Sequence, residues 1–229
     1  MTITDDMIKN ASSSSGYLKS LTVSESNWNN PWGQDLTRFT EDFISCVEKN
    51  LFPELGVTID CLLDKRIINA KNVKLFDDDI FASKAIESNK IETGIQAGYS
   101  KDNLKKTYGK AILISSDKNE GFYPSMNKTA VVSDRKGLHY LVHEMMHVLA
   151  NPAYVETLRT KEDPIGDEGI NEFFARFASI YYINKNPNAT GVKSAEGVGL
   201  YQNKYPLNCK SNISVDKTKE LAKSYFLKE

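Results

Sequence analysis

Apolar residues recur at helical spacing in several parts of the chain. Leu36, Phe39, Phe43, Val47 and Leu51 lie three or four positions apart, so they share one face of a helix that we expect to end near FPELG, residues 52–56. The same reasoning predicts helices from about 136 to 150, where Asn151-Pro152 stops the pattern, from about 167 to 184, and over the last fifteen residues, VDKTKELAKSYFLKE.

Short runs rich in β-branched residues predict strands at GVTIDCLL (56–63), KAILISS (110–116) and KTAVVS (128–133). Residues 1–33 are rich in Ser, Asn and Thr and predict a loosely structured N-terminal arm. No internal repeat or linker divides the chain after residue 34. The pattern therefore predicts one α+β domain at 34–229 behind an arm at 1–33.

Composition excludes several classes of function. The 229 residues carry 29 basic and 30 acidic side chains, a net charge of −1, so no strong positive field exists to attract nucleic acid or an anionic membrane. The N-terminus has no signal-peptide pattern, and no apolar run approaches the length of a transmembrane helix. Three cysteines without metal-binding spacing indicate a reducing compartment. We expect a protein that is cytoplasmic as made and that has no nucleic-acid or membrane partner.

All three histidines lie in LHYLVHEMMHVLANP, residues 138–152. Residues four apart share a helix face, so His143 and His147 can both bind one metal ion. Glu144 falls between them, where it can orient and deprotonate a metal-bound water. This H-E-x-x-H spacing is a metallopeptidase signature. The rest of the helix is nearly all apolar and therefore buried, and a metal would satisfy its polar stripe.

His139 lies one further turn back along the same helix. Side chains from three consecutive turns of one helix cannot surround one tetrahedral ion. We therefore expect His139 either to contact a metal ligand without binding the ion itself or to lie in the substrate cleft. The site needs another protein ligand, and because no histidine remains, that ligand is a carboxylate or a cysteine.

Downstream stands PIGDEGINEFFARFASIYY, residues 164–182, in which Glu168 and Glu172 are four apart on the second predicted helix. H-E-x-x-H followed by E-G-x-x-E resembles the gluzincin metallopeptidases, which include thermolysin-like enzymes, aminopeptidases and clostridial collagenases. The resemblance covers roughly residues 128–185. It implies a zincin-like α+β domain with a small mixed sheet, and one Zn²⁺ bound by His143, His147 and Glu168. Glu172 would then hydrogen-bond a ligand histidine.

A second register remains open. NEFFARF also resembles the glutamate segment of anthrax lethal factor, which would make Glu172 the ligand and place Arg176 behind it. Arginine cannot accept a proton from imidazole, so we favour Glu168. The resemblance also implies a residue that stabilises the oxyanion, for which loop position suggests Tyr154, Tyr201 or Tyr205.

These motifs predict a monomeric zinc endopeptidase that hydrolyses a protein or peptide with a metal-activated water, with Glu144 as general base. A small chain of this kind without a signal resembles bacterial effectors or toxins that a secretion system delivers into a host or competitor cell. One alternative is a binding module on a zincin scaffold without turnover. Another is a zinc hydrolase of non-peptide amides that uses an upstream cysteine; DCLL around Cys61 lacks the glycine such enzymes carry.

Overall fold

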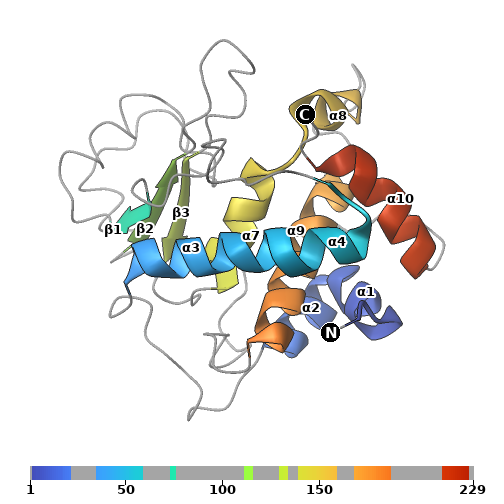
Figure 1. Cartoon of the computed structure of the whole chain (residues 1–229), viewed down its shortest axis with the longest axis horizontal. Helices are drawn as coiled ribbons and strands as arrows, with labels where there is room; N and C mark the ends of the chain where they lie inside the picture. Colours follow the sequence, from blue (N-terminus) through green and yellow to red (C-terminus); the bar gives the residue numbers. More distant parts are fainter. Residues whose placement is uncertain are drawn as a thin grey trace.

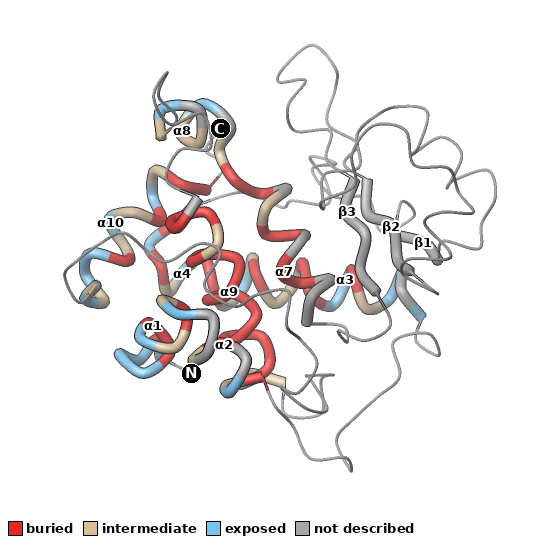
Figure 2. The backbone as a smooth tube through the Cα atoms, turned by 180° about the vertical axis from the view of Figure 1, so that it is seen from behind, coloured by how far each residue is buried: buried red, intermediate tan, exposed pale blue. Residues whose placement is uncertain are grey.

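In the computed structural model, the described residues are 2–21, 35–58, 73–75, 111–115, 129–133, 139–158, 168–186 and 213–226. Helices make up most of this part of the chain, and they surround one apolar core (Figures 1 and 2). The helical segments are α1 (Asp5–Ala11), α2 (Ser14–Leu21), α3 (Leu36–Cys46), the π-helical turn η3 (Val47–Leu51), α4 (Phe52–Leu55), α7 (His139–Val148), α8 (Pro152–Thr157), α9 (Glu168–Lys185) and α10 (Val215–Tyr225).

Helix α9 is the centre of the core. Its side chains from Ile170 to Ile183 are buried, apart from the half-buried Glu172. Such a helix, apolar on nearly every side, must be covered by other elements. Helices α7, α1 and α2 pack against it, and rings from α10 cover its N-terminal half, where Phe174 stacks on Tyr225 with centroids 4.6 Å apart.

Residues 2–21, which lie within the predicted arm, form α1 and α2, and buried side chains of both helices belong to the core. Thr4 caps α1, its side chain accepting the Met7 amide hydrogen. The buried residues recur at helical spacing within each helix, Met7, Ile8 and Ala11 in α1 and Tyr17 and Leu21 in α2, and Ile3 before α1 is buried as well. Gly16 permits the close approach of the two helices, because a Cβ there would lie 3.0 Å from the Asn10 Cα. The expected boundary at 33/34 lies outside the described residues.

Helix α3 continues through η3 into α4, so the predicted helix that begins at Leu36 and ends near FPELG is confirmed (Figure 1). Asp35 caps its start, its side chain accepting the Arg38 amide hydrogen. The π-helical turn precedes Pro53, which has no amide hydrogen to donate. Gly56 ends the helix in the left-handed conformation at φ 69°, a conformation that glycine adopts without strain.

The predicted α+β fold with a small mixed sheet is wrong. The described part is dominated by helices, and its core is built by helical residues and their immediate neighbours. Its strands are short: β1 (Val73–Leu75), β2 (Ala111–Ser115) and β3 (Thr129–Ser133). They pair in the order β1-β2-β3, antiparallel throughout, with Leu75 opposite Ile112 and Ala111 opposite Ser133. The runs of β-branched residues located β2 and β3 but did not reveal that helices would build the core of the described part.

The remaining predicted elements compare as follows. The helices predicted at 136–150, 167–184 and the end of the sequence are confirmed as α7, α9 and α10. The strand predicted at 56–63 falls mostly outside the described residues. Among the described helices, none is long and apolar enough to cross a membrane.

Candidate metal centre

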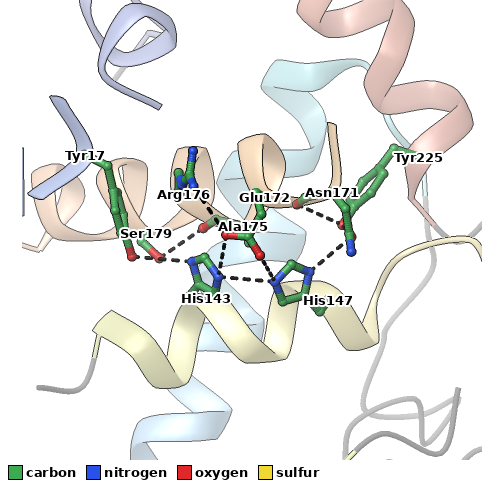
Figure 3. A network of polar contacts seen from close by, with 9 residues as sticks. All are labelled: Tyr17, His143, His147, Asn171, Glu172, Ala175, Arg176, Ser179 and Tyr225. Carbon is green, nitrogen blue, oxygen red and sulfur yellow. Dashed lines mark hydrogen bonds and ion pairs between the residues drawn. The ribbon is translucent and has the colours of Figure 1, made fainter. Parts of the chain in front are cut away.

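Two histidines and a glutamate converge where α7 and α9 lie side by side (Figure 3). His143 and His147 are one turn apart on α7, and both rings point towards α9. Glu172, in the first half of α9, points its carboxylate between them. One nitrogen or oxygen from each residue lies within 4.8 Å of the others, so the described part of the chain holds a group that can bind a metal ion.

The distances match the requirements of a tetrahedral ion. His143 Nε2 and His147 Nε2 are 3.2 Å apart. Glu172 Oε1 lies 3.3 Å from His147 Nε2, and Glu172 Oε2 lies 3.5 Å from His143 Nε2. Ligands at 2.0–2.2 Å from a tetrahedral Zn²⁺ are separated by about 3.3–3.6 Å. These donor atoms can therefore surround one ion with little movement of either helix.

Asn171 determines which nitrogen of His147 faces the cluster. Its Oδ1 lies 3.1 Å from His147 Nδ1 and 2.5 Å from the Tyr225 hydroxyl. A carbonyl oxygen can only accept, so Nδ1 of His147 carries the proton and Nε2 presents a lone pair. That lone pair faces a carboxylate and a second imidazole. A cation among these atoms would balance their repulsion, so the donor set fits a metal.

Tyr17 from α2 contacts His143, the other histidine of the cluster. Its hydroxyl lies 3.5 Å from His143 Nδ1, and the two rings meet with centroids 5.9 Å apart. Both side chains are buried. When Nε2 of His143 binds a cation, Nδ1 carries the proton and donates to the Tyr17 oxygen.

Arg176 lies beside Glu172, one turn further along α9. Its Nη2 is 3.6 Å from Glu172 Oε2, and the arginine side chain is only 2% exposed. Within the described residues, Glu172 Oε2 and Arg176 Nε are buried without a hydrogen-bond partner. Burial alone would raise the pKa of the Glu172 carboxyl, but His143 and His147 outweigh it and hold that pKa well below its usual value. The carboxylate anion is the form of glutamate that binds a metal ion.

The other predicted site residues are placed less fully. Glu144 and His139 lie in α7 and Glu168 begins α9, but their side chains are outside the described residues. Tyr201 and Tyr205 are also outside them. Tyr154 lies in α8, half-buried and packed against the apolar core.

The sequence did not indicate Tyr17, Asn171 or Tyr225 as site residues. Tyr17 and His143 are 126 positions apart, and Asn171 and Tyr225 are 54 apart, so no local spacing links them. A signal did exist for Asn171, because a polar residue on an otherwise apolar helix needs a buried partner.

Comparisons of this chain with models of protein families, with curated proteins and with solved structures each found no match. The site is therefore interpreted from its own geometry and chemistry.

Proposed function

We propose that this protein is a zinc-dependent metallopeptidase in which His143, His147 and Glu172 hold the ion. The observation that carries the proposal is the convergence of two imidazole Nε2 atoms and one carboxylate at 3.2–3.5 Å from one another. Two nitrogens and one oxygen form the ligand set of many catalytic zinc sites, which leave the fourth position for water or substrate.

The contacts of Glu172 support a role as a metal ligand better than a role in a purely structural ion pair. It is the shared neighbour of both histidines, and one of its oxygens is buried without a hydrogen bond to any residue that the structure describes. If Glu168 were the ligand, the resemblance would make Glu172 the hydrogen-bond partner of a ligand histidine. In the structure, Asn171 already contacts Nδ1 of His147, the ring nitrogen that points away from the cluster. We therefore assign the ligand to Glu172, while the Glu168 assignment stays a prediction from the sequence.

When bound, Zn²⁺ lowers the pKa of a water and polarises the carbonyl to be attacked. The residues of the chain supply the rest of the chemistry. Glu144 follows His143 directly in α7, and we assign it the general-base role: it takes the proton of the attacking water and passes it to the leaving amine. Asn171 holds His147 in the tautomer that keeps Nε2 free.

The Glu144→Gln variant tests this assignment. The protein is expected to contain close to one equivalent of zinc, measured by elemental mass spectrometry, and to cleave a proteome-derived peptide library at new N-termini detected by mass spectrometry. Glu144→Gln should retain zinc and lose cleavage at least about 100-fold, because only the proton transfer is removed. Glu41→Gln, at an exposed position of α3, is the matched control and should behave as the wild type.

The outcomes separate the parts of the proposal. Zinc binding without cleavage by the wild-type protein would exclude a peptidase and leave a metal-binding module. Undiminished cleavage by Glu144→Gln would refute the general-base role. A wild-type protein that binds no zinc would refute the metal centre itself.

A further inference from the structure

Each ligand histidine is connected, through its outer ring nitrogen, to a tyrosine hydroxyl from a distant helix. Tyr17 of α2 reaches His143 directly, whereas Tyr225 of α10 reaches His147 through Asn171 (Figure 3). The two tyrosines come from opposite ends of the sequence and approach the site from opposite sides. Neither lies at the cluster of donor atoms, so each can affect the ion only through a histidine.

The Tyr17 contact is built by the packing of α1 and α2. The Tyr17 side chain is fully buried, and α2 is held against both α1 and α9. Gly16, its neighbour, lets α2 approach the Asn10 backbone closely. The hydroxyl therefore stays at Nδ1 of His143 because the helix that carries it has little freedom to move.

The Tyr225 contact is at least as well fixed. The ring is fully buried, stacks on Phe174 and meets Phe226 edge to face. Its hydroxyl donates to Asn171 Oδ1 at 2.5 Å and lies 3.4 Å from the Asn171 carbonyl oxygen. By donating to Oδ1, the hydroxyl holds the Asn171 amide in the orientation that presents this oxygen, and not its NH₂ group, to His147.

We infer that Tyr17 and Tyr225 are positioning residues of the metal centre, which orient His143 and His147 and select the tautomers with Nε2 free to bind metal. This inference rests on the metal site of the proposed function but not on peptide cleavage. Partners of this kind are carboxylates, backbone carbonyls or waters in most zinc sites, and their loss costs roughly 10- to 100-fold in metal affinity. Here phenol hydroxyls, one direct and one relayed by an amide, take that place.

The test uses Tyr17→Phe, Tyr225→Phe and the double variant, all in the full chain. The matched control is Tyr181→Phe, which also removes a hydroxyl from a buried ring. That hydroxyl donates to Glu54 Oε1 over 2.8 Å and does not contact the metal cluster. Three quantities are measured for each protein: the zinc dissociation constant by competition with a chromophoric chelator, the visible spectrum of the Co²⁺-substituted protein, and the melting temperature in EDTA.

We expect each single variant to weaken zinc binding about 10-fold and the double variant about 100-fold, because the two hydroxyls act on different histidines. The Co²⁺ spectrum, which reports ligand geometry, should shift in these variants and not in Tyr181→Phe. All four variant proteins lose a hydrogen bond of a buried ring, so each can have a lower melting temperature in EDTA. If that lower melting temperature were the only change in Tyr17→Phe and Tyr225→Phe, the role of these tyrosines would be merely structural and the inference would be overturned.

The failures are distinguishable. Zinc affinity and Co²⁺ spectra that are unchanged in both single variants and in the double variant would refute the positioning role while leaving the metal centre intact. A wild-type protein without zinc affinity would refute the metal centre and this inference together. Zinc affinity that falls in the variants of a protein without peptidase activity would support the inference and reject only the enzymatic proposal.

Discussion

Replacing Glu172 with Gln separates the metal-binding role of this residue from its packing. Glutamine keeps the shape of the side chain but removes the negative charge among the three donor groups. The carboxylate is 12% exposed and its histidine partners are 1% and 12% exposed. Because these side chains are largely buried, removing one charged partner should cost about 3–5 kcal/mol, as it does for buried ion pairs. The cost of about 0–1 kcal/mol that is typical of exposed ion pairs does not apply here.

A loss of that size lowers zinc affinity about 10²- to 10⁴-fold, at roughly 1.4 kcal/mol per factor of ten. At a zinc concentration of 1,000 times the wild-type dissociation constant, bound zinc stabilises the wild type by about 4.1 kcal/mol. A variant that binds about 10³-fold more weakly would gain only about 0.4 kcal/mol at the same concentration. With about 2–4 °C per kcal/mol for a chain of this size, the zinc-induced rise in Tm should differ by about 7–15 °C.

The assay is differential scanning calorimetry with saturating zinc and with EDTA, for the wild type, Glu172→Gln and the exposed control Glu41→Gln. Subtracting the EDTA melting temperature removes any change in the stability of the metal-free protein. A full zinc-induced rise in Glu172→Gln would refute the assignment of this residue as a ligand. If Glu168→Gln then lost the rise instead, the ligand would lie one turn earlier on α9.

Two further substitutions have expected outcomes. Asn171→Asp should raise zinc affinity about 10-fold, because a carboxylate accepts the His147 Nδ1–H more strongly than an amide does. It should also lower the Tm in EDTA, because the new side chain buries a charge. Chelator competition measures the first effect and calorimetry the second, and weaker zinc binding would contradict the relay from Tyr225 through Asn171 to His147. Gly16→Ala should destabilise the protein by about 1 kcal/mol in urea unfolding. Its Cβ would meet the Asn10 backbone, and an overpacking cost of about 2 kcal/mol, the middle of the usual range, outweighs the helix-propensity gain of about 1 kcal/mol. A variant more stable than the wild type would contradict that packing.

Sequence patterns located the elements that carry the site because helical periodicity is local information. The spacing of Phe39 and Phe43 with their neighbours indicated α3, and the apolar residues around His143 and His147 indicated a buried α7. The spacing of His143 and His147 also predicted that the two rings would converge, and in the structure their Nε2 atoms lie 3.2 Å apart.

The sequence was a weaker guide where polar residues concealed a pattern or where tertiary packing decided the contacts, and the choice between Glu168 and Glu172 stays a prediction. The serines of residues 12–15 suggested a loose arm, although Met7 and Ala11, and likewise Tyr17 and Leu21, are four positions apart, as on one face of a helix. The preference for Glu168 assumed that the partner of a ligand histidine lies four residues after the ligand glutamate. In the structure, Asn171 contacts His147 from the position just before Glu172, a possibility that spacing alone did not suggest.

The distance along the chain between Tyr17 and Tyr225 has a consequence for biosynthesis. At about 5–20 residues per second, a ribosome takes about 10–40 s to proceed from one tyrosine to the other. For that interval His143 and His147 can be synthesised and α7 can form, while the partner that fixes Asn171 does not yet exist. A nascent chain would therefore hold zinc less tightly than the finished protein. On the proposed metal centre, tight metal loading would accordingly be a late event that follows the docking of α10 onto α9.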